Sequence, residues 1–231
     1  MTTYDAAELE RAKLEALAEF AAGAGHEINN PLAVISGRAQ LLLRDESDPE
    51  RRRELGIIRA QALRIHEMIA DLMLFARPPL PVRKPSDLSA IITAAVEGLR
   101  PKADLLQVRV ERAGTMEPCS ALVDTDQIQV ALRSVIDNGL NALTVGGRIE
   151  VELSVIDDAA ADILVRDDGP GIPAAVREHL FDPFFSGREA GRGLGMGLAK
   201  AWRIVTNHGG TIEVGSPPNR GASITLRIPR K

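Results

Sequence analysis

His26-Glu27-Ile28-Asn29-Asn30-Pro31-Leu32 is the stretch around which the rest of the sequence is organised. It lies in a segment whose apolar residues recur every three or four positions, a spacing that predicts a helix with one buried stripe. The stripe comprises Leu17, Phe20, Ala24, Ile28, Leu32, Ile35, Ala39 and Leu42. His26 is two residues from both Ala24 and Ile28, which is about 200° around a helix. Its imidazole is therefore predicted to face water.

The neighbours of His26 allow two interpretations. Glu27 is adjacent, and Asn30 follows one helical turn later on the same face. Pro31 lacks a backbone donor and should bend the helix. An exposed histidine beside a carboxylate can act as a nucleophile with a base, but a solvated histidine on a polar face is the more common case for such a pair alone.

Composition limits the possible classes of protein. The chain has 231 residues, a net charge of −4 and a single cysteine, Cys119. The charge gives no basic field for nucleic acid or anionic membranes, and one cysteine excludes an internal disulfide framework. No apolar run reaches the ~20 residues that span a bilayer, and residues 1–5 do not resemble a signal peptide. We therefore expect a soluble, cytoplasmic protein with no nucleic-acid partner and no direct membrane span.

The first 80 residues are predicted to form a helical hairpin. One helix covers about residues 5–43, and a second covers 50–76, with Ser47 or Asp48 as its cap and Pro49 at its first position. The second helix carries a heptad stripe at Leu55, Ile58, Ala62, Ile65, Ile69 and Leu72. Two helices cannot bury both stripes, so a homodimeric four-helix bundle is expected, with burial against the second domain as the alternative. His66 is interpreted as structural or solvated.

Residues 81–231 are predicted to form a second, α+β domain. Arg77-Pro78-Pro79-Leu80-Pro81 is a stiff linker at the boundary. Beyond it, Asp87 caps one helix, and further helices are expected at about 124–143 and 195–207. Strands are expected at 108–111, 121–124, 148–155, 161–165, 211–214 and 222–228. A mixed sheet with helices packed on one face follows.

Four motifs in this second domain suggest a nucleotide site. Asn138 and Asn141 share one face of a predicted helix, and the Asn138 carbonyl oxygen suits a hard cation such as Mg²⁺. Asp167-Asp168-Gly169-Pro170-Gly171 follows a strand, where a carboxylate can accept a hydrogen bond from a base amino group. Taken singly, exposed asparagines on a polar face and a plain Asp-Gly turn explain these motifs equally well.

The other two motifs are a phenylalanine-rich loop and a glycine-rich loop. Phe181-Asp182-Pro183-Phe184-Phe185 holds three of the five phenylalanines and fits either a mobile lid or ordinary core packing. Gly191-Arg192-Gly193-Leu194-Gly195-Met196-Gly197 runs into a helix, as phosphate-binding loops do. The spacing matches neither a P-loop nor a dinucleotide-binding fingerprint. A flexible loop without a ligand is the alternative.

Together, these motifs resemble those of the sensor histidine kinases of two-component signalling. Residues 26–32 are similar to the H box, 138–142 to the N box, 167–172 to the G1 box, 181–185 to the F box and 191–197 to the G2 box, in the family's order. The resemblance covers about residue 10 to the end. The H box and lid look most like the nitrogen-regulation type.

The resemblance implies a fold, an activity and partners. The fold is a dimerisation and histidine-phosphotransfer hairpin (1–80) followed by a Bergerat-type ATP-binding domain (81–231). The activity is autophosphorylation by ATP with Mg²⁺ and transfer to an aspartate of a response-regulator receiver domain, with phosphatase activity also expected. A sensor input from a missing segment or a separate protein is expected.

The resemblance also implies roles for individual residues. His26 is the phospho-acceptor, Glu27 its acid/base partner, and Asn30 orients water in dephosphorylation. Asn138 binds Mg²⁺ and Asp167, rather than Asp168, reads adenine. The remaining expected nucleotide contacts are Asn141, Gly169, Gly171, Phe184, Arg188, Gly193, Leu194, Gly195, Met196 and Gly197. Two departures bear on phosphate contacts: Ser134 stands where many relatives have asparagine, and Asn141 where a basic residue is frequent.

Three other functions compete with this interpretation. One is an ATP-binding switch of the same fold without histidine transfer. Another is a dimeric scaffold that binds a regulator but no nucleotide. The third is a serine/threonine kinase acting on an anti-sigma partner, in which the hairpin with His26 would have no role.

Overall fold

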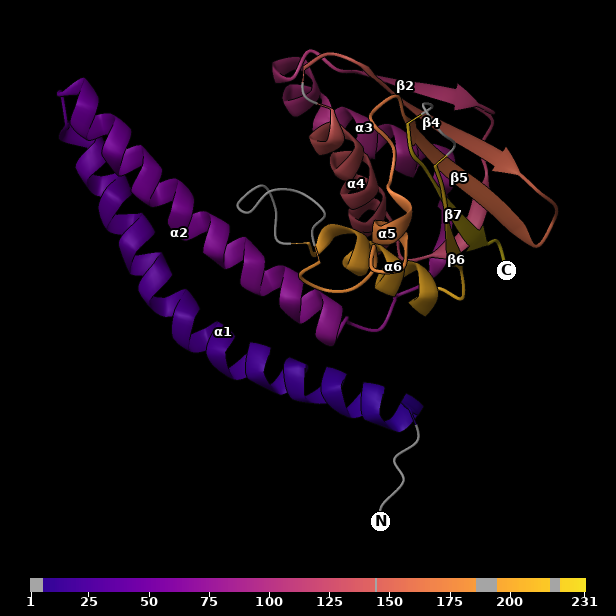
Figure 1. Cartoon of the computed structure of the whole chain (residues 1–231), viewed down its shortest axis with the longest axis horizontal. Coiled ribbons are helices and arrows are strands. Elements are labelled where there is room, and N and C mark those ends of the chain that lie inside the picture. Colours follow the sequence, from indigo (N-terminus) through magenta and orange to yellow (C-terminus); the bar gives the residue numbers. More distant parts are fainter. Residues whose placement is uncertain (1–5, 144, 186–194, 217–220) are drawn as a thin grey trace. The chain divides into compact units, whose positions relative to one another are not determined.

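The computed structural model describes residues 6–143, 145–185, 195–216 and 221–231. Within it the chain divides into two compact units, residues 1–79 and 80–231. The first holds two helices and the second holds the remaining helices and all the described strands (Figure 1).

The first unit is a hairpin of α1 (Ala6–Asp45) and α2 (Pro49–Ala76), as predicted. Pro31 lies inside α1, whose axis curves in Figure 1. Asp48 caps α2 through hydrogen bonds that its Oδ1 accepts from the backbone N–H groups of Glu50 (2.8 Å) and Arg51 (3.1 Å), which satisfies donors that the first turn leaves unpaired. The Arg52 guanidinium donates to the carbonyls of Leu43 and Glu46 and so fixes the turn.

The two helices bury only the line along which they meet. Gly25 is buried, and a Cβ there would lie 3.1 Å from Ile69 Cγ2, so glycine permits this close approach. Leu32 is 7% exposed, but Ile28 and Ile35 on the same stripe are 40% and 45% exposed. In a single chain α2 therefore covers only one edge of the α1 stripe, as expected of two helices that cannot bury both stripes, and burial of the rest by a second copy stays a prediction.

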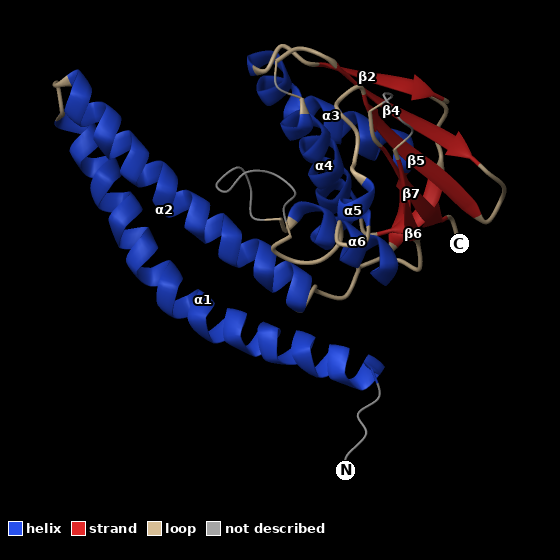
Figure 2. Cartoon of the chain, viewed as in Figure 1, coloured by secondary structure: helices blue, strands red, loops and turns tan. Residues whose placement is uncertain are grey.

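The second unit is built on a five-stranded mixed sheet in the order β2-β4-β5-β7-β6. Its strands are β2 (Arg109–Gly114), β4 (Arg148–Val155), β5 (Ala160–Asp167), β6 (Thr211–Gly215) and β7 (Ser223–Pro229). The β2–β4 pair is parallel, and the other neighbours are antiparallel. Its helices are α3 (Leu88–Leu105), α4 (Thr125–Ala142), α5 (Ala174–Arg177) and α6 (Gly197–Asn207). Figure 2 shows α3, α4 and α6 on one side of the sheet, as predicted.

Alternation along the strands explains this layered arrangement. On β4, Ile149, Val151 and Leu153 are buried, while the intervening side chains are polar and partly exposed. A strand with period-two alternation buries one face and hydrates the other. The buried faces of α4 and α6 complete the core.

Two short elements were not predicted. β1 (Lys84–Asp87) pairs antiparallel with β3 (Ser120–Val123), with Asp87 opposite Ser120. Asp87 also caps α3, as expected, through a hydrogen bond from the Ser89 N–H. The second missed element is α5, a single turn after Pro173.

A buried histidine joins the ends of two helices of the second unit. His208, 3% exposed, follows α6. Its Nδ1 donates to the Ile204 carbonyl (2.8 Å), and its Nε2 accepts from the N–H of Asp124, the N-cap of α4 (3.1 Å). Because Nε2 accepts this bond, the ring is neutral in the folded state. Burial lowers the pKa of His208 below its ordinary value of 6.5.

Acidification should therefore destabilise the second unit through His208. The unfolded chain binds a proton near pH 6.5, and the folded chain only at lower pH. The contribution is complete above the unfolded pKa and falls as pH decreases below it, by up to about 1.4 kcal/mol per pH unit. Urea unfolding followed by Trp202 fluorescence, at pH 7.5 and 5.5, should show this loss in wild type and a smaller loss in His208→Gln. Equal losses in both proteins would contradict this role.

Candidate functional site

The polar residues around His26 face solvent on α1. His26, Glu27 and Asn30 are all exposed, whereas Gly25 and Leu32 of the same helix are buried. The exposure of His26 predicted from helical spacing is therefore confirmed. An imidazole with this exposure is accessible to a phosphoryl donor, and Glu27 follows it directly in the chain.

A second histidine contacts this stretch. His66 on α2 is exposed, and its Nδ1 donates a 2.9 Å hydrogen bond to Asn29 Oδ1. His66 thus links α2 to the residue just before Asn30. This agrees with its interpretation as a structural or solvated side chain.

In the second unit, α4 presents Asn138. Asp124 begins the helix: its Oδ1 accepts from the Gln127 N–H, and its Oδ2 accepts from the Val82 N–H. Burial acts to raise the pKa of Asp124, but these backbone hydrogen bonds prevail and hold it below its usual range. A carboxylate that stays ionised keeps α4 capped. Asn138, more than three turns along, is partly buried.

A glycine next to Asn138 brings α4 close to the sheet. A Cβ on Gly139 would lie 3.1 Å from Ile149 Cδ1 and 3.7 Å from Asp167 Cβ. A Cβ at 139 would require the end of the Ile149 side chain to shift slightly. This contact places the turn that carries Asn138 beside the end of β5, where Asp167 lies.

The two adjacent aspartates have different surroundings. Asp167 Oδ1 accepts from the N–H groups of Gly169 (2.9 Å) and Ala222 (3.2 Å), which fix the carboxylate at the end of β5. Asp168 Oδ1 accepts from the Arg148 N–H (2.8 Å) and so ties the loop to the start of β4. Asp168 therefore has a structural role. Which of the two carboxylates contacts a ligand stays a prediction.

The glycines after Asp167 allow the loop to pack tightly. A Cβ on Gly169 would meet Asp167 Oδ1 at 2.8 Å. Gly171 has φ +79°, and a Cβ there would lie 2.7 Å from Ser216 Oγ. Ser216 Oγ also accepts from the Ile172 N–H at 2.7 Å. Ser216 is a supporting residue that the sequence interpretation missed, because only folding brings it beside residues 44 positions earlier.

The start of α6 lies beside α4. Met196 is the N-cap and is buried, and a Cβ on Gly197 would lie 3.8 Å from the Ser134 carbonyl oxygen. The N–H groups at the first turn of α6, which find no partner within a helix, are therefore near the helix that carries Asn138. Ser134 itself donates to the Val130 carbonyl at 2.9 Å.

Phenylalanine and glycine motifs meet at the same end of α6. Gly195 has φ +71°, and a Cβ there would lie 2.7 Å from the carbonyl carbons of Phe184 and Phe185. Phe184 is half exposed and has φ +65°, a backbone conformation that costs a non-glycine residue energy. The two segments that flank residues 186–194 are therefore in contact. The predicted contacts Arg188, Gly193 and Leu194 lie outside the described residues.

The Asn141 side chain on α4 is hydrogen-bonded to two neighbouring side chains. Its Nδ2 donates to Asp137 Oδ2 (2.8 Å), and its Oδ1 accepts from Lys102 Nζ on α3 (2.9 Å). Lys102 Nζ also lies 2.5 Å from Asp137 Oδ1. Sequence patterns had not indicated Lys102, because it belongs to a different helix.

These residues form a chemically consistent set on one side of the second unit. Asn138 offers an amide oxygen suited to a hard cation, and Asp167 is a fixed carboxylate that can accept from a base amino group. The first turn of α6 offers backbone N–H groups suited to an anion. The loops pack closely around these groups because glycine stands at positions 169, 171 and 195, where a Cβ would clash with neighbouring atoms.

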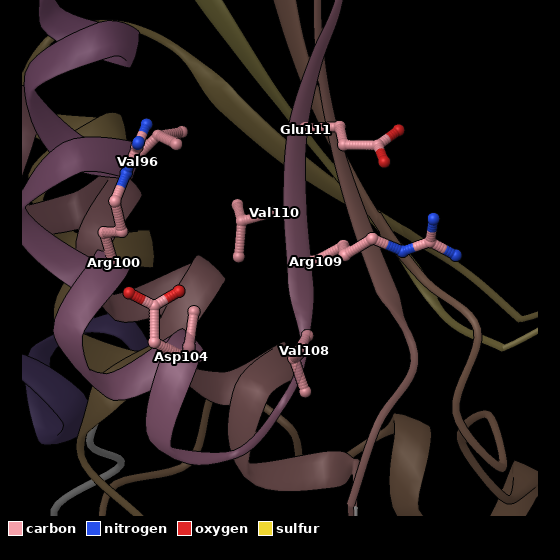
Figure 3. A pocket seen from close by; sticks show the side chains of 8 residues that line it. Val96, Arg100, Asp104, Val108, Arg109, Val110 and Glu111 are labelled. Carbon is pink, nitrogen blue, oxygen red and sulfur yellow. The ribbon is translucent and has the colours of Figure 1, made fainter.

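A cavity elsewhere in this unit does not involve these residues. It has a volume of about 270 Å³ and lies between α3 and β2. Figure 3 shows Val110 directed toward α3, with Arg109 and Glu111 directed away from it. Its charged residues are of both signs: Arg100, Asp104, Arg109 and Glu111. None of the described residues predicted for the nucleotide site lines this cavity.

Two family matches cover most of the chain. Residues 16–80 match the His Kinase A (phospho-acceptor) domain. Residues 123–231 match the histidine kinase-, DNA gyrase B- and HSP90-like ATPase family. The first match contains His26, and the second contains Asn138, Asp167 and the glycine motifs.

Individual relatives agree with these matches. The chain is 32% identical to sporulation kinase D of Bacillus subtilis (strain 168) over 229 residues, which cover 99% of this chain and 45% of the relative. It resembles the crystal structure of full-length ShkA in complex with AMPPNP, with a TM-score of 0.80, 24% identity, and coverage of 91% of this chain and 45% of that one. It also resembles ThkA in complex with the response regulator protein TrrA, with a TM-score of 0.70, 22% identity, and coverage of 96% and 64%.

The chain spans about half the length of the curated relatives that it matches. Among the described helices, none combines the length and the apolar character needed to cross a membrane. Three findings agree with one another: the order of the two matched domains, the mixed sheet with its helices, and the similarity to sporulation kinase D. The chain belongs to the sensor histidine kinase family, with a phospho-acceptor hairpin followed by an ATPase-type α+β domain.

Proposed function

We propose that the chain phosphorylates itself on His26 with ATP and passes the phosphoryl group to an aspartate of a response-regulator receiver domain. The observation that carries this proposal is the grouping of three elements in the second unit: the Asn138 turn of α4, Asp167 at the end of β5, and the first turn of α6. The exposed His26 in a matched phospho-acceptor domain provides the acceptor.

Each residue of the second unit has a distinct task toward ATP in this proposal. Asp167 accepts a hydrogen bond from the adenine amino group. The backbone N–H groups from Gly195 onward contact the phosphates. Asn138 holds Mg²⁺ through its amide oxygen, and a bound Mg²⁺ neutralises phosphate charge. Arg188, Gly193 and Leu194 remain predicted contacts.

The transfer step uses the residues of α1. A ring nitrogen of His26 attacks the γ-phosphorus in line, a nitrogen–phosphorus bond forms, and the bond to the β–γ bridging oxygen breaks, with ADP as the leaving group. Glu27 takes or orients the ring proton of His26. Positioning supplies most of the rate in reactions of this type. Transfer requires the two units to meet during turnover, across the linker that includes Pro78 and Pro79.

Phosphotransfer to the partner, and hydrolysis of the resulting aspartyl phosphate to inorganic phosphate, are further parts of the proposal. The likeness to ThkA bound to a response regulator shows the fold alone, and the proposed partner follows from family membership. Asn30, exposed one turn after His26, is proposed to orient water in a phosphatase reaction. The nitrogen-regulation subtype and a cytoplasmic location stay predictions.

The exposed stripe of the hairpin supports a homodimer. Ile28, Ile35, Ile58 and Ile65 are each 40–46% exposed in the single chain, and a second copy would bury them in a four-helix bundle. The active form of the enzyme is therefore proposed to be a dimer.

Substitution of His26 tests the phospho-acceptor. Wild type incubated with γ-labelled ATP and Mg²⁺ should acquire an acid-labile, base-stable label, and His26→Gln should acquire none while still binding ATP. His66→Gln is the matched control, because it removes another exposed histidine of the same hairpin, and it should keep the label. Label on His26→Gln would refute the assignment. ATP binding without label on wild type would instead favour the ATP-dependent switch.

A charge in the heptad stripe tests the dimer. Ile58→Glu places a carboxylate on a face that the proposed partner helix covers, and burial of an unpaired charge is costly. Light scattering should show twice the chain mass for wild type and mostly the single-chain mass for Ile58→Glu. Leu105→Glu, at an 84% exposed position in the second unit, should stay dimeric. A monomeric wild type at micromolar concentration would contradict the proposal.

A further inference from the structure

One cation from α3 is held against α4 within a turn of the proposed Mg²⁺ ligand. Lys102 Nζ lies 2.5 Å from Asp137 Oδ1 and 2.9 Å from Asn141 Oδ1. Asp137 directly precedes Asn138. Asn141 lies three residues after Asn138, on the same face of the helix. Lys102 therefore lies beside the part of α4 assigned to the nucleotide.

The arrangement leaves part of the ammonium group available. A lysine ammonium has three N–H donors, and Asp137 and Asn141 accept two of them. The side chain is 38% exposed. Within the described residues, no third hydrogen-bond partner of Lys102 is found. One donor can therefore point toward a ligand that lies over this face of α4.

The charges beside Asn138 favour binding of an anion only if Lys102 is present. Without it, the Asp137 carboxylate would stand next to Asn138 and repel a triphosphate. Lys102 neutralises that carboxylate, and the hydrogen bond from Asn141 to Asp137 Oδ2 (2.8 Å) holds the acceptors in place. An ordinary surface ion pair of this exposure contributes little to stability, so the effect of losing it on folding should be small.

We infer that Lys102 contacts the phosphates of the nucleotide. Position 141 of α4 holds an asparagine and no basic residue, and Lys102 of α3 would provide the positive charge there instead. The contact between Lys102 and Asn141 is what links the two positions. This inference rests on the proposed ATP site, and it adds to that site a residue from a different helix. A basic side chain at 141 and the lysine at 102 should be interchangeable as phosphate contacts.

Binding measurements with and without phosphates test this inference. The full chain is titrated calorimetrically with ATP in Mg²⁺ and, separately, with adenosine. Lys102→Gln should weaken ATP binding on the order of tenfold, the usual effect of losing one charge-assisted hydrogen bond, and leave adenosine binding unchanged. Lys102→Arg should retain most of the ATP affinity. Lys84→Gln, which removes an equal charge on β1, should bind both ligands as wild type does.

A relocated charge makes the test sharper. The double variant Lys102→Gln, Asn141→Lys should recover most of the lost ATP affinity, a rescue that a purely structural role would not produce. Unchanged ATP affinity in Lys102→Gln would overturn the inference and leave the ATP site standing, and so would equal weakening of ATP and adenosine. Failure of the wild type to bind ATP would overturn the proposed function itself.

Discussion

The candidate site depends on one close contact, between Gly139 of α4 and the core side of β4 and β5. A Cβ at that position would be 3.1 Å from Ile149 Cδ1 and 3.7 Å from Asp167 Cβ, so glycine lets the helix pack this closely without a shift of the Ile149 side chain. The contact fixes where Asn138 lies relative to Asp167. The start of α6 reaches the same region because Gly197 packs near the Ser134 carbonyl. Three potential ligand groups, an amide, a carboxylate and a helix N-terminus, are brought together by glycine-mediated packing.

The two units satisfy their apolar residues in different ways. The second unit closes its own core: Ile149, Val151 and Leu153 of β4 face the helices and are fully or almost fully buried. The hairpin leaves much of its heptad stripe exposed because two helices meet along only one line. Regular apolar spacing is thus followed by complete burial of the apolar side chains in the second unit and by only partial burial in the hairpin. The core of the second unit therefore positions the candidate nucleotide site within a single chain.

Local signals in the sequence were enough to predict the main elements. Ser47 or Asp48 followed by Pro49 predicted the start of α2, where Asp48 proved to be the cap, and the alternation at residues 148–155 predicted β4. The short β1 strand was missed because its four residues include Pro85 and lack apolar alternation. The site was predicted as motifs along the chain, and the structure places Asn138, Asp167 and Gly195–Gly197 on adjoining elements. Lys102 could not be found this way, because its contact with Asn141 arises from the packing of α3 on α4. What covers the exposed part of the α1 stripe could not be read from the sequence, because spacing shows which residues are apolar but not what covers them.

The most direct test of this account is to map where ATP binds along the chain. Amide resonances of the ¹⁵N-labelled protein would be followed during titration with ATP and Mg²⁺. The account predicts that the largest shift changes occur at Asn138, Gly169 and Gly195–Gly197, the groups that converge around the α4–β5 contact. Changes concentrated instead at Val96, Val108 and Val110, which line the cavity between α3 and β2, would contradict it.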